Sequence, residues 1–592
     1  MMALIFTELI FTVPSDFPDF PNRRKGASKN SRSWLAGLVF FCLGLLGPLY
    51  PAQGDIIRIG SGANCNALSI THALQQALVT PGPDEIRLEK EFSYNESIVI
   101  DNATVQGPVT LSGGWESCTS SSSTGRSFIL RTSPPAVVTV TNNQVVVLDG
   151  IELFGLGQIS LDVSSGSQVT LINSHVGSGS TGIRVSLGAE VTLERDSLVI
   201  FNETTSPDEG GGITCGLPGT PNSGGTVNIN GQVFSNSAPN GGGIHGRWPN
   251  CRIIVGEGAV IRDNEATFGG GVFLAQGAFM GGGGTGSQGS RIHSNNAEQG
   301  GGLYVTDPGT RATLFNTRIE NNEAMFTGGG VEVRKDGFFS LNRSPVNDCP
   351  NPPRCSVISR NQLTFPGDNE GSALYVRNGG QAELFRVFIE ENSGFNRAGQ
   401  AIHVEDDNTT ILLHSVQIWN NRTQAAMSAT GSAALSGAYV SVARNNWLVA
   451  GESFLPSFGA SASGGADVTL VTSILTDTRG YSGDVVGDCL IVDDDNNLTA
   501  FNTLVGVDPG FQDPASGDLH LRSTSPALDY CDDSYPPIGS DIDLQSRGND
   551  NPLEPNLLGP YDLGADENTD SPLIFADGFE SGNTSSWPVT AP

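Results

Sequence analysis

Short apolar runs separated by glycine, asparagine and serine make up most of this chain. The runs are three to six residues long and rich in β-branched residues, as in VVTVT (137–141) and VTLER (191–195). Such runs are typical of short strands bounded by turns. Helical spacing of apolar residues is clear only at 67–78, where Ala73, Leu74, Ala77 and Leu78 share one face. The pattern predicts an all-β protein with one helix near its beginning.

A block of small residues followed by one aliphatic residue recurs through the middle of the chain. The intact copies read GGGI, GGGV or GGGL, and GSAL and GQAI continue them in degenerate form. Successive aliphatic residues are 31, 28, 31, 28, 43 and 28 positions apart, and the long step contains the insertion NDCPNPPRC. A fixed period of this length predicts a repeat architecture. The aliphatic residues are Ile213, Ile244, Val272, Leu303, Val331, Leu374 and Ile402.

An asparagine precedes each of these blocks, and a valine or isoleucine stands three residues before each asparagine. Asparagine tolerates the left-handed backbone of a tight corner, and its amide can hydrogen-bond to an equivalent amide above or below. We therefore expect each asparagine to form a bend and to stack on the next. This asparagine ladder consists of Asn202, Asn236, Asn264, Asn295, Asn322, Asn361, Asn392 and Asn421.

Short strands, a repeat of about thirty residues and stacked asparagines together predict a parallel β-helix solenoid. The repeats lack the leucines of a leucine-rich horseshoe and are shorter than propeller blades. A disordered chain would not keep an aliphatic residue in register after each glycine block.

The paired GGG[IVL] and apolar-x-x-Asn motifs over 199–421 resemble the repeats of polymorphic outer membrane proteins, and more broadly bacterial right-handed parallel β-helix proteins. The resemblance implies a right-handed coil and a place at the surface of a Gram-negative cell. Polymorphic outer membrane proteins also carry a C-terminal translocating barrel. This chain has no matching series of alternating strands and ends in SSWPVTAP, so self-translocation is not expected.

The chain divides into five predicted parts. Residues 1–54 contain a basic stretch and an apolar run that read as a signal peptide, with a membrane anchor as the alternative. Residues 55–130 would form an N-terminal cap and the first coils, 131–450 the β-helix, and 451–567 a closing segment in which Leu519, Leu521, Pro526, Ala527 and Leu528 end the core. Residues 568–592 form a tail with the signature DGFESGNTSSW, similar to one on exported gamma-proteobacterial proteins.

Eight cysteines remain beyond the signal segment, and an even number in an exported chain predicts disulfides. The sequence does not fix their connectivity, but pairing neighbours gives Cys65–Cys118, Cys215–Cys251, Cys349–Cys355 and Cys489–Cys531. No Cys/His cluster has the spacing of a zinc site, so no metal site is predicted from the cysteines.

The formal charge of −31, with only four lysines, disfavours nucleic acid and anionic lipid as partners. The residue after each aliphatic anchor is expected to face solvent. These residues form a predicted binding stripe: His245, Phe273, Tyr304, Glu332, Tyr375 and His403. Such a stripe could bind a polysaccharide or a surface protein, or its aromatic rings could simply stack on one another.

Two catalytic alternatives depend on the later coils, where Arg334, Arg377 and Glu405 join Glu332. A polysaccharide lyase would use clustered carboxylates with calcium and a basic residue, and a glycoside hydrolase would use two carboxylates. The acidic segment VDDDNN (492–497) could bind calcium, but it lacks the EF-hand spacing of ligands, so a solvated loop is the preferred interpretation. We expect no other cofactor.

The sequence thus predicts a secreted or outer-membrane-surface protein that binds a glycan or a partner without catalysis. A lyase or hydrolase on the 332–405 face is the first alternative, and a structural envelope protein is the second.

Overall fold

The computed structural model describes residues 54–80, 82–131, 134, 136–284, 289–344, 354–366, 370–397, 399–448, 454–532, 539–548 and 557–568. The predicted signal peptide up to residue 53, the tail after residue 568, and Cys349 of one predicted disulfide lie outside the described residues.

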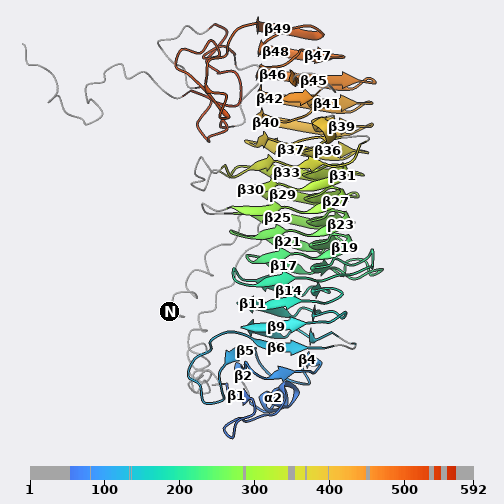
Figure 1. Ribbon diagram of the computed structural model, residues 1–592, viewed down its shortest axis with the longest axis vertical. Coiled ribbons are helices and arrows are strands. Elements are labelled where there is room, and N and C mark those ends of the chain that lie inside the picture. The colour runs from blue at the N-terminus through green and yellow to red at the C-terminus, as the bar shows by residue number, and fades with distance from the viewer. Residues whose placement is uncertain are drawn as a thin grey trace, which may run out of the picture. The chain divides into compact units, whose positions relative to one another are not determined.

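The described chain winds into a right-handed parallel β-helix (Figure 1), as the repeat predicts. One middle coil contains β20 (Ile244–Arg247), β21 (Arg252–Val255), β22 (Val260–Arg262) and β23 (Glu265–Phe268). Equivalent strands of successive coils pair in parallel, so the coils stack at about 4.8 Å. The seven aliphatic anchors pair with one another in order. Each step of the repeat is therefore one coil, and the 43-residue step is a coil with an insertion.

Two sheets flank the glycine blocks. Sheet B follows each block and has 14 strands, and sheet C precedes the block in five coils. Besides β20, sheet B contains β4 (Ile98–Ile100), β7 (Val138–Val140), β10 (Leu161–Val163), β13 (Ile183–Val185), β16 (Ile213–Cys215), β24 (Val272–Ala275), β28 (Leu303–Thr306), β32 (Val331–Arg334), β36 (Leu374–Arg377), β39 (Gln400–Glu405), β41 (Ala425–Thr430), β45 (Phe458–Ser463) and β47 (Tyr481–Ser482). Besides β23, sheet C contains β19 (Ser237–Asn240), β27 (Asn296–Gln299), β31 (Glu323–Thr327) and β35 (Gln362–Leu363).

Sheet A forms the third side of the coil, as two ribbons that fuse at β40 (Thr410–Trp419), which pairs with a strand of each. The first ribbon contains β1 (Ile56–Ile59), β2 (Asp84–Glu89), β5 (Val109–Trp115), β8 (Val145–Asp149), β11 (Gln168–Ile172), β14 (Glu190–Leu193), β17 (Thr226–Ile229), β21, β25 (Phe279–Gly283), β29 (Arg311–Phe315), β33 (Phe338–Asn342) and β37 (Gln381–Phe385). The second contains β3 (Ser93–Tyr94), β6 (Ser127–Leu130), β9 (Ile151–Phe154), β12 (His175–Gly177), β15 (Leu198–Ile200), β18 (Gln232–Phe234), β22, β26 (Ser290–His293), β30 (Thr317–Glu320), β34 (Val357–Ser359) and β38 (Phe388–Glu390). After β40 come β42 (Ala434–Ala443), β46 (Asp467–Leu475), β48 (Val485–Val492) and β49 (Leu498–Val505).

The asparagine ladder is confirmed and is one member longer than predicted. In each step the side-chain nitrogen of one asparagine donates to the side-chain oxygen of the next, as from Asn264 to Asn295 at 2.9 Å. That oxygen also accepts from the backbone N–H of Asn264 at 3.1 Å. The last step runs from Asn421 to Asn445, at 2.9 Å, in a coil whose glycine block is lost.

The expected bend at the ladder asparagine was wrong by one residue. The left-handed backbone lies at the residue before it, with φ between 51° and 58°, whatever the side chain is. The asparagine itself supplies hydrogen bonds that hold the corner closed and offset the cost of this conformation. The left-handed residues are Phe201, Ser235, Asp263, Ser294, Asn321, Arg360, Glu391, Asn420 and Arg444.

Glycine is required in the blocks for two reasons, which the opening pair of one block illustrates. Gly269 has a φ of +64°, in the region that favours glycine. A Cβ on Gly270 would lie 2.4 Å from the carbonyl oxygen of Asn296 in the next coil. The block is therefore a tight turn at which adjacent backbones touch.

The inward residues of sheets A and B form one apolar core that runs from Ile57 to Val492. At its N-terminal end, α2 (Ile70–Ala77) covers β1, β2 and β4, with Ile70, Ala73, Leu74 and Ala77 buried. Ser69 caps the helix by accepting from the backbone N–H of His72. The predicted capping helix is thus confirmed, although Leu78 lies at its end rather than on its buried face.

The sequence predicts that the segment after β49 closes the end of the core, and this prediction is wrong. The segment folds back along the outer face of sheet A (Figure 1), where Leu519, Leu521, Ala527 and Leu528 pack against outward side chains such as Trp419. Pro526 is only partly buried. The physical reason is that β40, β46 and β48 carry apolar residues on their outward face, which this segment covers. The short strands β50 (Phe511–Asp513) and β51 (Asp518–Leu521) belong to it, and a hairpin of β43 (Asn446–Leu448) and β44 (Phe454–Pro456) precedes it.

Three of the four predicted disulfides are confirmed, Cys65–Cys118, Cys215–Cys251 and Cys489–Cys531, and the fourth includes Cys349, which lies outside the described residues. The third joins β48 to the folded-back segment and fixes that segment to the coils. Within the described residues, no helix has the length and apolar character needed to span a bilayer.

Candidate functional site

The predicted stripe is one column of side chains on the outer face of sheet B, here called the sheet B column. Its six members pair in register, from His245 through Phe273, Tyr304, Glu332 and Tyr375 to His403. The sequence therefore placed these residues together correctly.

The expectation that the sheet B column faces solvent was wrong. Phe273 is half-buried, and the other five side chains are buried. The cause is the tight glycine turn, which folds the end of sheet C against the outer face of sheet B. The ring of Phe268 at the end of β23 lies 5.4 Å from that of Tyr304, and Thr327 at the end of β31 contacts Glu332.

The aromatic members of the column stack on one another, as the alternative interpretation of the stripe proposed. The rings of Phe273 and Tyr304 lie 5.4 Å apart and nearly parallel, and those of Tyr375 and His403 lie 5.6 Å apart. His245 meets Phe273 edge-on at 4.9 Å. Burial raises the pKa of both tyrosines and holds the pKa of His245 well below its usual range.

Three of the four predicted catalytic residues are engaged in structural contacts. Glu332 has no exposed surface, and its oxygens accept from Thr327 at 2.7 Å and from Arg377 at 3.1 Å. Burial raises the pKa of Glu332, against the opposing charge of Arg377. Arg334 and Arg377 pair in register, and their guanidinium groups lie over the rings of Tyr304 and Tyr375. A substrate could not reach the Glu332 carboxylate in this arrangement.

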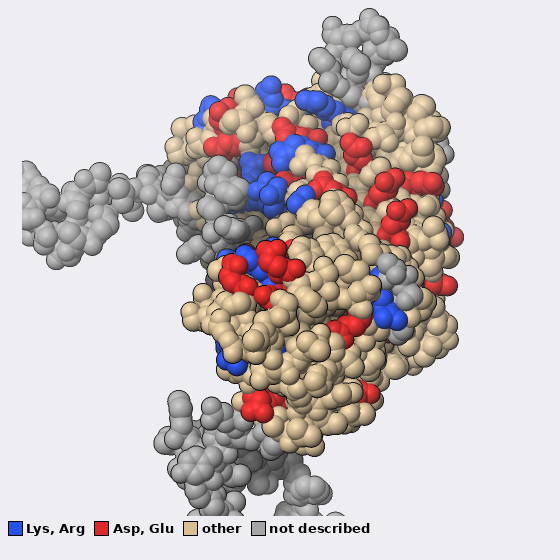
Figure 2. Space-filling view, turned by 60° about the horizontal axis from the view of Figure 1, so that its bottom comes forward, with Lys and Arg blue, Asp and Glu red and all other residues tan. Residues whose placement is uncertain are grey.

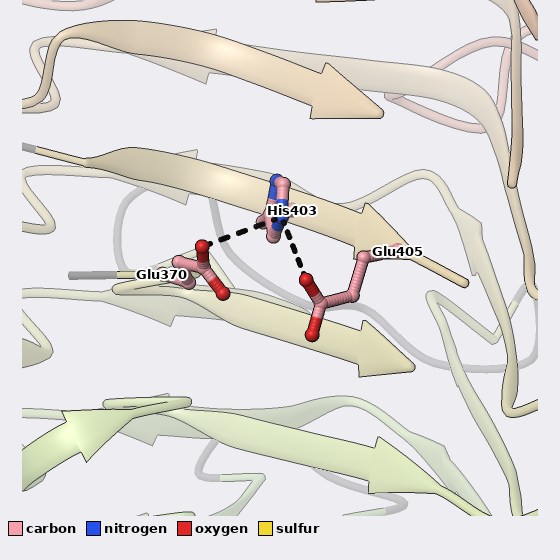
Figure 3. A group of neighbouring side chains, drawn as sticks. All are labelled: Glu370, His403 and Glu405. Atoms are coloured by element: carbon pink, nitrogen blue, oxygen red, sulfur yellow. Dashed lines mark ion pairs between the residues drawn. The ribbon is translucent and has the colours of Figure 1, made fainter. Parts of the chain in front are cut away.

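The fourth residue, Glu405, belongs to a different cluster at the end of the column. It accepts a hydrogen bond from the Tyr375 hydroxyl, and its other oxygen lies 3.9 Å from Nε2 of His403. Glu370, from the coil before, lies on the other side of the same nitrogen, also at 3.9 Å (Figure 3). The facing His403 and then the Tyr375 hydrogen bond lower the pKa of Glu405.

Sequence reasoning missed Glu370 because no local motif marks it. The residue immediately precedes Gly371, the first residue of a degenerate glycine block, and it reaches His403 only because the next coil lies above it. Pairing in register, rather than spacing along the chain, is the signal that could have found it.

A second histidine–carboxylate group lies in the folded-back segment. His520 is hydrogen-bonded through one ring nitrogen to Asp518 and through the other to Asp543, with Asp566 close by. The hydrogen bond to Asp543, more than any other interaction, raises the pKa of His520 to about 10. This imidazole is therefore held as a cation between carboxylates.

The acidic 492–497 segment forms its own hydrogen bonds. Asp493 accepts from the backbone N–H of Thr478, and Asp494 accepts from Asn496. Calcium binding at this segment stays a prediction.

A second column lies on the exposed outer face of sheet A, here called the sheet A column. It consists of Arg252, Phe279, Arg311 and Phe338, which pair in register on four successive coils. Each arginine lies over the following phenylalanine ring, with Arg252 4.9 Å from Phe279 and Arg311 4.8 Å from Phe338. Both arginines are exposed and both rings are half-buried.

The surroundings of the sheet A column are unusual for so acidic a protein. None of the strands β21, β25, β29 and β33 contains an aspartate or a glutamate. Among the described residues, neither Arg252 nor Arg311 forms an ion pair with a carboxylate. On the face seen in Figure 2, most basic side chains lie in the upper part together with acidic ones, and further acidic side chains lie along the right-hand side.

The second ribbon of sheet A adds further arginines beside the column. Arg291, Arg318 and Arg360 all contact the buried carboxylate of Glu320, at 2.6, 2.9 and 2.9 Å. Burial alone would raise the pKa of Glu320, but the hydrogen bonds from these arginines outweigh it and lower the pKa. Three guanidinium groups thus share one carboxylate.

No protein-family model matches this chain, and no curated protein matches it.

Proposed function

We propose that the protein is an exported, non-catalytic binder of anionic polysaccharide, and that the sheet A column is its binding surface. The observation that carries the proposal is the column itself: alternating exposed arginines and phenylalanines in strict register, without a carboxylate in the four strands that present them.

The geometry suits an extended polymer rather than a compact ligand. Because coils stack at about 4.8 Å, Arg252 and Arg311 stand about 9.6 Å apart along the axis of the solenoid. This spacing is comparable with a disaccharide unit, so a chain lying along the axis would meet one arginine at every second sugar. Each guanidinium can hold a carboxylate or sulfate with two hydrogen bonds.

The phenylalanine rings contribute in two ways. They hold the guanidinium groups in place by cation–π contact, which reduces the freedom lost on binding. Their remaining exposed faces can pack against the apolar faces of sugar rings.

Two further observations support the export and the absence of catalysis in this proposal. Three disulfides are typical of proteins that fold outside the cytoplasm, in agreement with the signal-like segment of the sequence. The burial of Glu332 in an ion pair removes one of the two carboxylates on which the alternative hydrolase would depend.

The test is binding of the protein to polygalacturonate, heparin and neutral dextran, measured by isothermal titration calorimetry. We expect binding to the two anionic polymers, weakening as salt is added, and none to dextran. The double variant Arg252→Gln/Arg311→Gln should bind about tenfold more weakly, since exposed ion pairs contribute up to about 1 kcal/mol each.

Arg422→Gln provides the matched control, because Arg422 is equally exposed but lies at the corner beside the asparagine ladder. This variant should bind as the wild type does. Equal affinity of the double variant and the wild type, or equal binding of dextran, would overturn the proposal.

A further inference from the structure

We propose that Glu370, His403 and Glu405 bind one divalent transition-metal ion, with Zn²⁺ as the reference ion. This site is independent of the sheet A column and of the proposed polysaccharide binding.

The imidazole of His403 carries the first argument. It is 1 % exposed, and among the residues that the structure describes neither of its ring nitrogens has a hydrogen-bond partner. A buried polar group without a partner is costly, and structures rarely retain one without a reason. A neutral imidazole has a lone pair on one nitrogen, to which a metal ion can bind.

The two carboxylates provide the second argument. One oxygen of Glu370 and one of Glu405 each lie 3.9 Å from Nε2 of His403, and the three ligand atoms all lie within 4.8 Å of one another. These separations are too long for hydrogen bonds. In a tetrahedral zinc site with bonds of about 2.1 Å, adjacent ligand atoms lie about 3.4 Å apart. Closing the group around an ion therefore requires each carboxylate oxygen to approach the imidazole by about 0.5 Å and the two oxygens to approach each other by up to about 1.4 Å, a movement that the two glutamate side chains can share.

The orientation of Glu405 is fixed in the manner of a metal ligand. Its Oε1 accepts the hydrogen bond from the Tyr375 hydroxyl, which leaves Oε2 facing His403. Outer hydrogen bonds of this kind hold ligand carboxylates in place in known metal sites. Figure 3 shows the two carboxylates on either side of the ring.

The donor set selects the class of ion. One imidazole and two carboxylates suit zinc and its neighbours, whereas calcium takes six to eight oxygen ligands. The side chains of Glu370 and Glu405 are 27 % and 25 % exposed, so an ion can enter from solvent and a water can complete its coordination.

Two other histidines show what distinguishes this site. His245 occupies the same column and is also buried, but its ring lies 3.2 Å from Arg247, and no carboxylate of the described chain forms an ion pair with it. His520 has carboxylates, but both of its ring nitrogens are already hydrogen-bonded to them. Only His403 among these three combines ring nitrogens that have no hydrogen-bond partner in the described structure with facing carboxylates.

The experiment is calorimetric titration of Zn²⁺ into the untagged, EDTA-treated full chain, with Co²⁺ absorption as a second readout. We expect one ion per chain at this site and the visible absorption of a four- or five-coordinate cobalt complex. Glu370→Gln and His403→Ala should abolish both signals, and Tyr375→Phe should weaken binding by about 10- to 100-fold.

His245→Ala is the matched control, because it removes a buried imidazole from the same column without touching the proposed ligands. It should leave both signals unchanged. His403→Ala could fail to fold, so Glu370→Gln, a nearly isosteric substitution at a partly exposed residue, tests the site independently. Urea unfolding confirms that each variant is folded. Absence of binding, retention of binding in Glu370→Gln, or loss of binding in His520→Ala would overturn the proposal.

Discussion

The sheet A column and the sheet B column are built in the same way but differ in their exposure to solvent. Each is a line of side chains from successive coils, paired in register and rich in arginine and aromatic residues. On sheet A the line is open to solvent and its arginines have no carboxylate partners among the described residues. On sheet B the line is covered, and its charges pair with one another.

The neighbouring turn makes the difference. Sheet B begins directly after the glycine block, and the short turn places the end of sheet C against its outer face. The turn between sheet B and sheet A has three or four residues and no run of three glycines, and the sheet A face stays uncovered at β21 to β33. In a solenoid, therefore, the repeat decides which side chains align, and the adjoining turn decides whether a ligand can touch them.

The largest expected effect is on the free energy of unfolding, which should depend on the buried sheet B column much more than on the exposed sheet A column. Glu332→Ala removes one partner of a buried ion pair and leaves Arg377 facing an apolar gap. We expect a loss of about 2–4 kcal/mol in the free energy of unfolding, somewhat below the usual cost because Arg377 keeps contact with solvent. Urea unfolding measures it, and Glu332→Gln, which keeps a hydrogen-bond acceptor, should lose clearly less. A loss below about 1 kcal/mol for the alanine variant would mean that the sheet B column is solvated after all.

A smaller effect concerns pH. Because burial depresses the pKa of His245 in the folded state, the unfolded chain binds a proton at this residue below about pH 6.5 and the folded chain does not. The protonation of His245 therefore costs the folded state no stability above about pH 6.5. Below that pH it lowers the free energy of unfolding by up to about 1.4 kcal/mol per pH unit.

The measurement is the difference in unfolding free energy between the wild type and His245→Gln at pH 5, 6 and 7. A difference is needed because raised pKa values, such as that of Asp566 at about 6, act in the opposite direction. As the pH falls, the free energy of unfolding should decrease less steeply in the variant, because the variant takes up one proton fewer on unfolding. A pH-independent difference would show that His245 is protonated, and hence solvated, in the folded protein. The sheet A column has no titrating group in this range, so Arg311→Gln should leave the pH dependence unchanged.

The contrast also explains what the sequence could and could not predict. The repeat of about thirty residues is visible in a single sequence. It is sufficient to predict the asparagine ladder, the aliphatic anchors and the stacking of Tyr304 on Phe273. The burial of Tyr304 depends on how tightly the chain turns at Gly300. The tightness of this turn sets the distance between two backbone segments, and no sequence pattern indicates that distance. The folded-back segment shows the same limit: the apolar residues 519–528 were recognised as packing residues, but not the face on which they pack.

The sheet A column was missed for a related reason. Arg252, Phe279, Arg311 and Phe338 share no motif, and the loops before them differ in length, so that only the strand pairing aligns them. The left-handed corner residues were missed because they range from Ser235 to Phe201 and Arg360, with no common side chain. Their conformation is imposed by the ladder that follows them.

The smallest expected effect is on the stability of the sheet A column. Arg311→Gln removes an exposed charge that forms no ion pair within the described part of the chain, so the free energy of unfolding of the variant should stay within about 0.5 kcal/mol of the wild type. The same substitution should weaken binding to polygalacturonate, and it should reduce the salt dependence of that binding because one fewer cation is involved. Urea unfolding beside titrations at two salt concentrations separates the two quantities. A variant that loses stability and binding together would indicate that Arg311 supports the sheet rather than a ligand, and the sheet A column would then be structural, as the sheet B column is.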